Sequence, residues 1–476
     1  MLRMLLVLLL LGCLAFEAQA EQWSQFRGPN ATGVSLESKA LPVEFSFEEH
    51  VLWSAKLGEG IACPVVSHGK VVSTAMTEDG KFVVFCFEAS TGNELWQKEF
   101  DAGALPAIMS PNTPASSTPA MDGERAYVYF STLGMMALNL SDGSVAWKRE
   151  VPQPHYLMGW GAAHSPIVYR DMLIFNQDDD LNPFLLALDK KSGDVRWKTP
   201  RPEMLAGYSV PVICRAGEQE DIVIAGSGKL VGYDPNTGEQ RWNCNTLLRT
   251  MMTTPAVVGD AIYVSVQSYG DTDRVLKLAL LQWKDTNQDG RLEKAEVGEA
   301  FWEKFEKGDQ DKDGFLVDDE IDVAFQNSAN MVGGGNTIQA IRGGGQGDVT
   351  DTHLIWNLDN KAPSNIVSPL VVDGRLFIVK KGGISACFDT EKGETIWLKK
   401  RIKNFGNYYA SPVAGDGKIY VMGENGFLVV LEQGPKPKVL AKNDMGEPCT
   451  ATPAIADGRI FVRTLNNLYC FSNEAK

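Results

Sequence analysis

Two twelve-residue stretches near the middle of the chain carry oxygen-bearing side chains at the spacing of a calcium-binding loop. Each has Asp or Asn at its first, third and fifth positions, glycine at the sixth and glutamate at the twelfth. Ca²⁺ takes hard oxygen ligands, the glycine permits a sharp turn, the seventh residue offers its backbone carbonyl, and the last glutamate can bind through both oxygens. The expected ligands are Asp285, Asn287, Asp289, Arg291 through its carbonyl and Glu296 in the first loop, and Asp309, Asp311, Asp313, Phe315 through its carbonyl and Glu320 in the second. The pattern is that of an EF-hand pair and predicts two calcium sites.

The segment between the loops fits the same interpretation. Leu292 and Leu316, at the eighth position of each loop, are expected to join the loops through a short β-bridge, and residues 297–308 are expected to form one linking helix. Residues 285–322 hold 14 acidic and 5 basic side chains, which is −9 of the chain's net charge of −15. This acidity argues against a nucleic-acid partner. The alternative, a merely solvated acidic loop, does not account for two complete matches in tandem.

The elements that must position these loops follow from a repeat along the rest of the chain. Eight prolines, each behind a small residue, open strand-like runs at separations of 55, 47, 45, 44, 114, 43 and 41 residues. A period near 45 suits four short strands with their turns, which is one blade of a β-propeller. The single long separation marks an insertion of about 70 residues in the fifth unit, because blade length is set by strand and turn lengths. The prolines are Pro64, Pro119, Pro166, Pro211, Pro255, Pro369, Pro412 and Pro453.

Tryptophans close most of these units. Five units end with a glycine four residues before a tryptophan, and Trp356 closes the fifth unit without that glycine. A large apolar face repeated at fixed register is expected to cover the seam between neighbouring blades. The five pairs are Gly92 and Trp96, Gly143 and Trp147, Gly193 and Trp197, Gly238 and Trp242, and Gly393 and Trp397. The run at residues 51–53 is left over at the front, and we expect it to complete the last blade and close the ring.

The expected fold is therefore all-β, an eight-bladed propeller of four-stranded blades with a small helical module inserted in the fifth blade. We divide the chain into residues 1–20, an N-terminal extension at 21–50, the propeller at 51–475 and the inserted calcium module at 270–335. Residues 1–20 have Arg3, an apolar run and a small-x-small site before Glu21, which predicts a secretion signal cleaved after Ala20 and a periplasmic or secreted protein. Cleavage before Cys13, giving a lipid anchor, is the second possibility. No later stretch is long and apolar enough to span a bilayer.

In an up-and-down blade, the connection between the second and third strands emerges on the face that carries the links between consecutive blades. The module is therefore expected on that face, where propellers usually bind ligands. Aromatic and hydrogen-bonding side chains are expected beside it, in a mixture that suits a protein or carbohydrate partner. These residues are His155, Tyr156, Trp160, His164, Arg201, Tyr208, Arg249, Asn404, Tyr408 and Tyr409. The alternative is that these loops only pack on one another around the channel.

The repeated Asp-x-x-x-Gly-x-x-x-Trp units at residues 189–197, 234–242 and 389–397 resemble the repeat of the pyrroloquinoline-quinone-like (PQQ-like) propeller superfamily. The resemblance covers about residues 51–471 outside the insertion. The opening segment at residues 23–29 looks like one that precedes the ring in secreted bacterial members. The superfamily includes quinoprotein alcohol dehydrogenases and a non-catalytic assembly factor of the outer-membrane β-barrel machinery. The repeat specifies a scaffold and leaves the activity open.

The residues favour the non-catalytic branch. Dehydrogenases of this type carry a vicinal cysteine pair over the quinone and a calcium-bound aspartate inside the ring, whereas this chain has no adjacent cysteines and its recognisable calcium ligands lie in the insertion. The five histidines do not form a metal-binding or hydrolytic spacing. We therefore expect a monomeric, calcium-binding interaction scaffold without PQQ. A quinoprotein oxidoreductase with an atypical active site is the alternative.

Overall fold

The computed structural model of the chain describes residues 22–156, 159–180, 182–202, 204, 207–226, 228–245, 252–270, 284–287, 289–325, 333–359, 366–402 and 406–474. The predicted secretion signal, its cleavage site after Ala20 and the alternative site at Cys13 lie outside these residues. No helix in the described part of the chain is long and apolar enough to cross a membrane.

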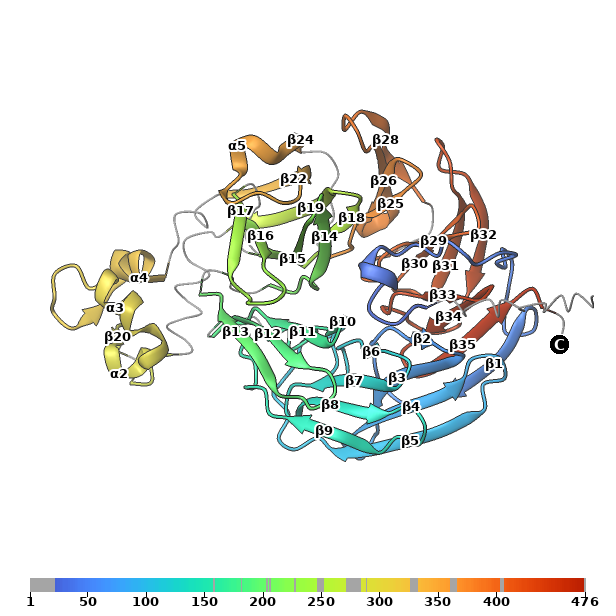
Figure 1. The fold of residues 1–476 in the computed structure, drawn as a ribbon, viewed down its shortest axis with the longest axis horizontal. Helices are drawn as coiled ribbons and strands as arrows, with labels where there is room; N and C mark the ends of the chain where they lie inside the picture. The colour runs from blue at the N-terminus through green and yellow to red at the C-terminus, as the bar shows by residue number, and fades with distance from the viewer. Residues whose placement is uncertain are drawn as a thin grey trace, which may run out of the picture.

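Eight radial sheets form a closed ring, as Figure 1 shows in a view close to the ring axis. Within each blade consecutive strands pair antiparallel from the centre outwards. The first four blades consist of β2 (Val65–Ser67), β3 (Lys70–Met76), β4 (Lys81–Glu88) and β5 (Glu94–Asp101); β6 (Ala120–Met121), β7 (Arg125–Phe130), β8 (Gly134–Asn139) and β9 (Val145–Arg149); β10 (Ile167–Tyr169), β11 (Met172–Gln177), β12 (Phe184–Asp189) and β13 (Val195–Pro200); and β14 (Val212–Ala216), β15 (Gln219–Gly226), β16 (Lys229–Tyr233) and β17 (Gln240–Cys244).

The other four blades repeat this order. They consist of β18 (Ala256–Val258), β19 (Ala261–Gly270), β22 (Gly333–Arg342) and β24 (Leu354–Asp359); β25 (Leu370–Val372), β26 (Arg375–Lys380), β27 (Ile384–Asp389) and β28 (Thr395–Arg401); β29 (Val413–Gly415), β30 (Lys418–Met422), β31 (Phe427–Glu432) and β32 (Val439–Asp444); and β33 (Ala454–Ala456), β34 (Arg459–Arg463), β35 (Asn467–Ser472) and β1 (Val51–Lys56). A fifth strand, β23 (Gly347–Asp348), pairs parallel with β17 and widens the fourth blade, which the sequence did not predict.

The N-terminal strand closes the ring as predicted. β1 pairs antiparallel with β35, with Ala55 opposite Leu468, and completes the blade that the C-terminal strands begin. Strands from the two ends of the sequence therefore share one sheet (Figure 1). The hydrophobic core lies in the seams between sheets, so the middle strands are buried along most of their length, as in β4, whereas the outer strand β5 buries little besides Trp96.

The tryptophans cover the seams, and each of five pairs with a glycine of the next blade. The indole of Trp96 lies over Gly143, and its Nε1 donates a hydrogen bond to Leu140 O at 3.1 Å. The same pair of contacts recurs for Trp53 over Gly92, Trp147 over Gly193, Trp197 over Gly238 and Trp356 over Gly393, with Nε1 donating at 3.0 Å to a carbonyl of the next blade each time. The motif glycine therefore serves the tryptophan of the preceding blade and not that of its own.

Two tryptophans break the pattern where the next blade lacks the motif glycine. Trp242 is fully buried in its own blade against Gly232, and its Nε1 donates to Asp221 Oδ2 at 2.8 Å. Trp397 faces the seventh blade, and its buried Nε1 has no hydrogen-bond partner among the described residues. The glycine in the following blade is therefore what permits the interblade hydrogen bond.

The insertion interrupts the fifth blade between β19 and β22, as predicted. Both strands are ten residues long, and their pairing extends from Ala261 opposite Arg342 to Gly270 opposite Gly333. The inserted module contains β20 (Leu292–Glu293), α2 (Lys294–Val297), η2 (Glu299–Phe301), α3 (Trp302–Gly308), β21 (Phe315–Leu316) and α4 (Asp318–Phe325). It lies outside the ring, at the left of Figure 1. The short helix α5 (Thr350–His353) and the turn η4 (Lys381–Gly383) complete the elements of this half.

The residues before the ring form an N-terminal strap, residues 22–47, that runs across several blades. Trp23 exchanges backbone hydrogen bonds with Val66 on β2, Asn30 pairs through its side chain with the backbone of Ile213 on β14, and Gly33 O accepts from Ala414 N on β29. The only helical turn in the strap is η1 (Pro29–Ala31). The strap therefore ties together inner strands that lie far apart in the sequence.

Candidate functional site

The first acidic loop folds with its side-chain oxygens turned onto its own backbone. Asp285 Oδ2 accepts from Gly290 N at 2.8 Å, Asn287 Oδ1 accepts from Asp289 N at 2.9 Å, and Asp289 Oδ1 accepts from Arg291 N at 3.0 Å. Glu296 reaches back from α2, and its Oε1 accepts from Thr286 N at 2.9 Å. Gly290 has φ 79°, which fits the sharp turn expected at the sixth position.

The second loop repeats this arrangement. Asp309 Oδ2 accepts from Gly314 N at 3.2 Å, Asp313 Oδ1 accepts from Phe315 N at 2.9 Å, and Glu320 Oε1 accepts from Gln310 N at 3.0 Å. One carboxylate oxygen from each of Asp309, Asp311 and Asp313 lies within 4.8 Å of the others. Asp309 Oδ1 is buried and has no hydrogen-bond partner among the described residues. Carboxylates at this separation repel one another, and a divalent cation between them would remove the repulsion.

The two loops share a small core and a short bridge. Leu292 pairs with Leu316 in the two-stranded sheet of β20 and β21, as the sequence predicted. Both leucines are fully buried with Phe301 and Phe305, which lie on the segment between the loops. The bridge and the core join the two loops. A conformational change in one loop would therefore be transmitted to the other through these contacts.

The module touches the links between blades. Lys304 Nζ donates to Pro202 O at 3.2 Å, and Pro202 lies between β13 and β14. Burial and then the positive charge of Lys284 lower the pKa of His155, which lies between β9 and β10. We call the face that carries these connections, such as residues 102–119 between β5 and β6, the link face. The module therefore sits beside the link face, where strand counting placed it.

A cavity of about 390 Å³ opens at the centre of the link face. Three of the predicted ligand residues, Trp160, Tyr208 and Tyr409, line it. Its deeper wall consists of residues that precede the blade-opening prolines, and Phe26 of the strap also lines it. The volume is in the usual range for a small-molecule site.

The other predicted ligand residues have different places. His155 lies at the module contact, Tyr408 is buried in the core between the sixth and seventh blades, and Arg249 and Asn404 lie outside the described residues. Tyr156, His164 and Arg201 are buried in polar contacts within the third and fourth blades. For these three the prediction of an accessible ligand face is wrong, because packing within the links has taken up their polar groups.

His164 shows how the buried polar groups are paired. Its Nε2 lies 2.8 Å from Gly207 O and also 3.3 Å from the backbone N of Asp178, and its Nδ1 lies 2.9 Å from Tyr156 Oη. Burial lowers the pKa of His164 to about 4. The neutral ring lies beside both Tyr156 and Tyr208, with centroid distances of 5.9 and 5.5 Å, and the two tyrosine rings are themselves 5.0 Å apart. The ring therefore supports Tyr208 at the cavity wall.

Arg201 is paired instead with an acid that the sequence analysis did not single out. Its Nε and Nη2 donate to the two carboxylate oxygens of Asp178 at 2.7 and 2.9 Å, and both side chains are fully buried. Its third nitrogen donates to the hydroxyl of Tyr233. Asp178 of the third blade neutralises the charge of Arg201, and Tyr233 belongs to the fourth blade. Arg201 therefore joins the two blades.

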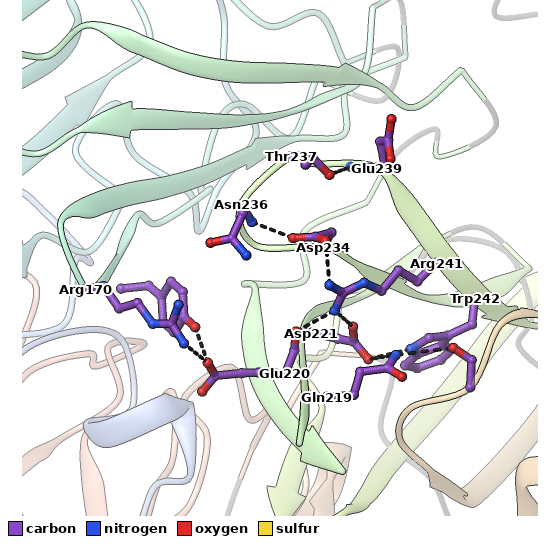
Figure 2. Close-up of polar contacts among 12 residues, drawn as sticks. Arg170, Gln219, Glu220, Asp221, Asp234, Asn236, Thr237, Glu239, Arg241 and Trp242 are labelled. Carbon is purple, nitrogen blue, oxygen red and sulfur yellow. Dashed lines mark hydrogen bonds and ion pairs between the residues drawn. The ribbon is translucent and has the colours of Figure 1, made fainter. Parts of the chain in front are cut away.

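A second cleft, of about 630 Å³, lies mainly on the fourth blade, and its arginines pair with carboxylates (Figure 2). Arg241 donates to Asp221 at 2.8 Å and also to Asp234, while Asp221 accepts from Trp242 Nε1 on its other oxygen. Glu220 pairs with Arg170 and with Arg215. Since its arginines already have carboxylate partners, we assign this cluster to the cohesion of the fourth blade.

Comparison with known proteins places this architecture in a family. A family model described as outer membrane protein assembly factor BamB matches residues 46–161, 158–317 and 298–473. The chain belongs to the BamB family. It is 22% identical over 440 residues to the outer membrane protein assembly factor BamB of Yersinia pestis, covering 88% of this chain and 95% of that protein.

Solved structures show the same fold. The crystal structure of BamB from Moraxella catarrhalis matches with a TM-score of 0.53 at 13% identity, over 90% of this chain and 98% of that one. A europium-containing methanol dehydrogenase matches with a TM-score of 0.57 at 10% identity, over 95% and 98%. At such identities the likeness concerns the fold alone, so it does not distinguish a BamB-like scaffold from a dehydrogenase.

The channel of this BamB-family chain does not fit a quinone with its calcium ion. No aspartate or glutamate is among the described residues that line the central cavity, so the carboxylate ligands of such an ion are missing there. Its one cysteine, Cys63, has no cysteine neighbour in the sequence. Among the described residues, the group of carboxylates close enough to hold a cation is Asp309, Asp311 and Asp313 in the inserted module.

Sequence reasoning missed two features of this channel. The first is Arg27 of the strap, which is fully buried. The only feature of the sequence that could have indicated this was its place in the opening segment before the ring. The small residues before the blade prolines were noted as repeat markers, yet they also line the cavity. Their recurrence at one register of every blade was the signal, because equivalent positions of a ring converge on its axis.

Proposed function

We propose that this protein is a non-catalytic scaffold that holds a protein partner on its link face during the assembly of outer membrane proteins. The single observation that carries the proposal is the match of the BamB family along nearly the whole propeller, residues 46–473. The relative from Yersinia pestis bears the description outer membrane protein assembly factor, and it aligns over 95% of its length. None of the described residues that line the central cavity is an aspartate or glutamate, which favours a non-catalytic role.

The place of action that we propose is outside the cytoplasm, as the predicted secretion signal requires. The test is depletion of the protein from its source cell, with quantification of folded outer membrane β-barrel proteins. A loss of several such proteins together is expected, followed by recovery when the full chain is supplied again. Unchanged amounts and folding of these proteins would overturn the assembly role.

We further propose that the inserted module binds two calcium ions and that calcium orders it beside the link face. Three observations support this: the carboxylates of Asp309, Asp311 and Asp313 lie within 4.8 Å of one another, Asp309 Oδ1 lacks a hydrogen-bond partner among the described residues, and the first loop has the same backbone arrangement. The contact between Lys304 and Pro202 joins the ordered module to a blade link. A bound ion would favour the folded module by mass action.

Calcium titration of the purified full chain tests this part. Glu296→Gln and Glu320→Gln each remove one charge from the residue expected to bind through two oxygens, so each variant should lose one binding event. Glu303→Gln on α3 is the matched control, since Glu303 is an exposed acid of the same module outside both loops. Isotherms of the loop variants that match those of the control would remove both loops as calcium sites.

A further inference from the structure

The residues that precede the blade-opening prolines form a nearly closed ring of hydrogen bonds around the channel. The backbone N–H of seven of these eight residues donates to the side chain of its counterpart in the next blade, at 3.0 to 3.2 Å. The ring includes a sulfur acceptor, because Thr452 N donates to Cys63 Sγ. It is interrupted only after Ser165, where Val210 offers no side-chain acceptor. The seven acceptor side chains are therefore held in position by the blades that carry them.

This ring leaves hydroxyl hydrogens free to donate. A hydroxyl that accepts an N–H still carries its own hydrogen, which needs a different acceptor. Thr254, Ser368 and Ser411 follow one another around the ring, all three line the cavity, and each is at most 2% exposed. Their hydroxyls accept at 3.0 to 3.1 Å and have no acceptor for their own hydrogens among the described residues. Three donors thus lie side by side on one arc of the cavity wall.

A positive charge lies next to this arc. Arg27 is fully buried, and its Nη2 donates to the carbonyl of Pro369, the residue that follows Ser368. Among the described residues its Nε and Nη1 have no hydrogen-bond partner, and no carboxylate pairs with it. Burial lowers the pKa of Arg27 to about 9, so the guanidinium is charged at neutral pH. A buried charge without a counter-ion is costly, and an anion nearby would offset that cost.

The outer part of the cavity has a different character. Trp160, Tyr208 and Tyr409 stand beside Met252, Ile61 and Ile366 in its lining. Aromatic and aliphatic side chains around a few convergent donors are the usual composition of a small-ligand site. The cavity therefore combines an apolar outer part with the three hydroxyl donors, and the guanidinium of Arg27 lies next to these donors.

We propose that the central cavity binds a carboxylate attached to an apolar or aromatic body. The carboxylate accepts from Thr254, Ser368 and Ser411 with Arg27 behind them, and the body lies between the aromatic side chains nearer the link face. Such a group can belong to a free organic acid or to the C-terminal residue of a polypeptide. The proposal concerns the channel alone and does not depend on calcium binding by the module.

Calorimetric titration of the purified full chain with four probes tests the site. The probes are 3-phenylpropanoate, its neutral amide, and a short peptide ending in phenylalanine with a free or an amidated C-terminus. The free acids should bind at least tenfold more tightly than their amides, because hydrogen bonds to a charged group are the stronger ones. Binding by 3-phenylpropanoate alone identifies a free acid as the ligand, and tighter binding by the free-ended peptide identifies a chain end. Equal affinities of acids and amides, or no binding by any probe, would overturn the proposal.

Variants of one ring hydroxyl complete the test. Ser411→Ala removes one donor and should weaken acid binding about tenfold. Ser411→Thr keeps the hydroxyl, as Thr254 and Thr452 do at equivalent places, and should restore binding even if the alanine variant is less stable. Ser385→Ala is the matched control, since Ser385 is buried on β27 and its hydroxyl donates to Lys400 O at 2.9 Å, outside the cavity lining. Acid affinity that is the same in the Ser411→Ala variant and in this control would contradict the assignment of the arc.

Discussion

The indole of Trp96 lies directly over Gly143 of the next blade, so close that a Cβ on this glycine would come within 2.6 Å of the ring. The same relationship joins five of the eight seams. It explains why glycine and tryptophan recur together in the sequence although they do not contact each other within one repeat. The glycine is the surface that the preceding tryptophan covers.

Replacement of Gly143 by alanine should therefore destabilise the ring. The residue has φ 71°, which alone costs an L-residue about 1–2 kcal/mol, and the new methyl group would displace the Trp96 indole. Gly80→Ala is the matched control, since Gly80 has φ 82° and open space around its Cβ position. Thermal unfolding should show a larger loss for Gly143→Ala than for Gly80→Ala. Equal losses would show that only the backbone conformation matters.

The interblade hydrogen bond of the indole can be separated from its packing. Trp96→Phe removes the bond to Leu140 O, whereas Trp397→Phe removes an Nε1 that has no partner among the described residues. Both changes lose similar apolar area, so Trp96→Phe should be more destabilising by about 1 kcal/mol. Chemical unfolding of the two variants measures the difference. A larger loss from Trp397→Phe would contradict this reading of the seam.

These seams also show how far the sequence could predict the fold. Proline and Gly-x-x-x-Trp spacing gave the blade number, the closure by β1 and the place of the insertion, because each depends on a local pattern repeated at a fixed period. Which tryptophan contacts which glycine depends on the stagger between neighbouring blades, which no single repeat contains. Pairing of β23 with β17 likewise joins residues about a hundred positions apart.

The residues of the candidate site also fall into two groups, those that a local sequence pattern predicts and those whose contacts depend on remote parts of the chain. The two acidic loops could be located from the sequence because all of their expected ligands lie within twelve residues, and calcium binding by them stays a prediction. Composition alone does not reveal whether a link residue such as Arg201 reaches the cavity or meets a buried acid, and Asp178 decides that outcome. Arg27 could not be placed at all, because its neighbours come from blades remote in the sequence.

The buried pair of Arg201 and Asp178 should be essential for stability. Asp178→Asn leaves a fully buried guanidinium without its counter-ion, so a loss of about 3–5 kcal/mol is expected. Asp194→Asn is the control, because Asp194 is 75% exposed in its pair with Arg149 and should contribute less than about 1 kcal/mol. Denaturant unfolding compares the two variants. A small loss from Asp178→Asn would mean that water reaches Arg201.

His164 should make the stability of the ring depend on pH. Its folded-state pKa is about 4, below the value of about 6.5 expected in the unfolded chain, so between these values the unfolded state binds more protons. The stability that the neutral ring provides is present above about pH 6.5 and is lost as the pH falls towards 4, by up to about 3 kcal/mol. The melting temperature of His164→Gln should fall less steeply over this range than that of the wild type. Parallel pH profiles would contradict burial of a neutral histidine.

The measurement that tests the central claim most directly is photo-crosslinking in the source cell from one position beside the link face. A photoreactive residue in place of Trp302, which is 41% exposed on α3, should capture an envelope protein, and the capture should weaken when Glu296 and Glu320 are both changed to glutamine. The control position is Leu95, 46% exposed on the outer strand β5, where no such product is expected. Capture from position 95 but not from position 302, or capture from 302 that is unaffected by the double change, would contradict a calcium-ordered scaffold that binds its partner on the link face.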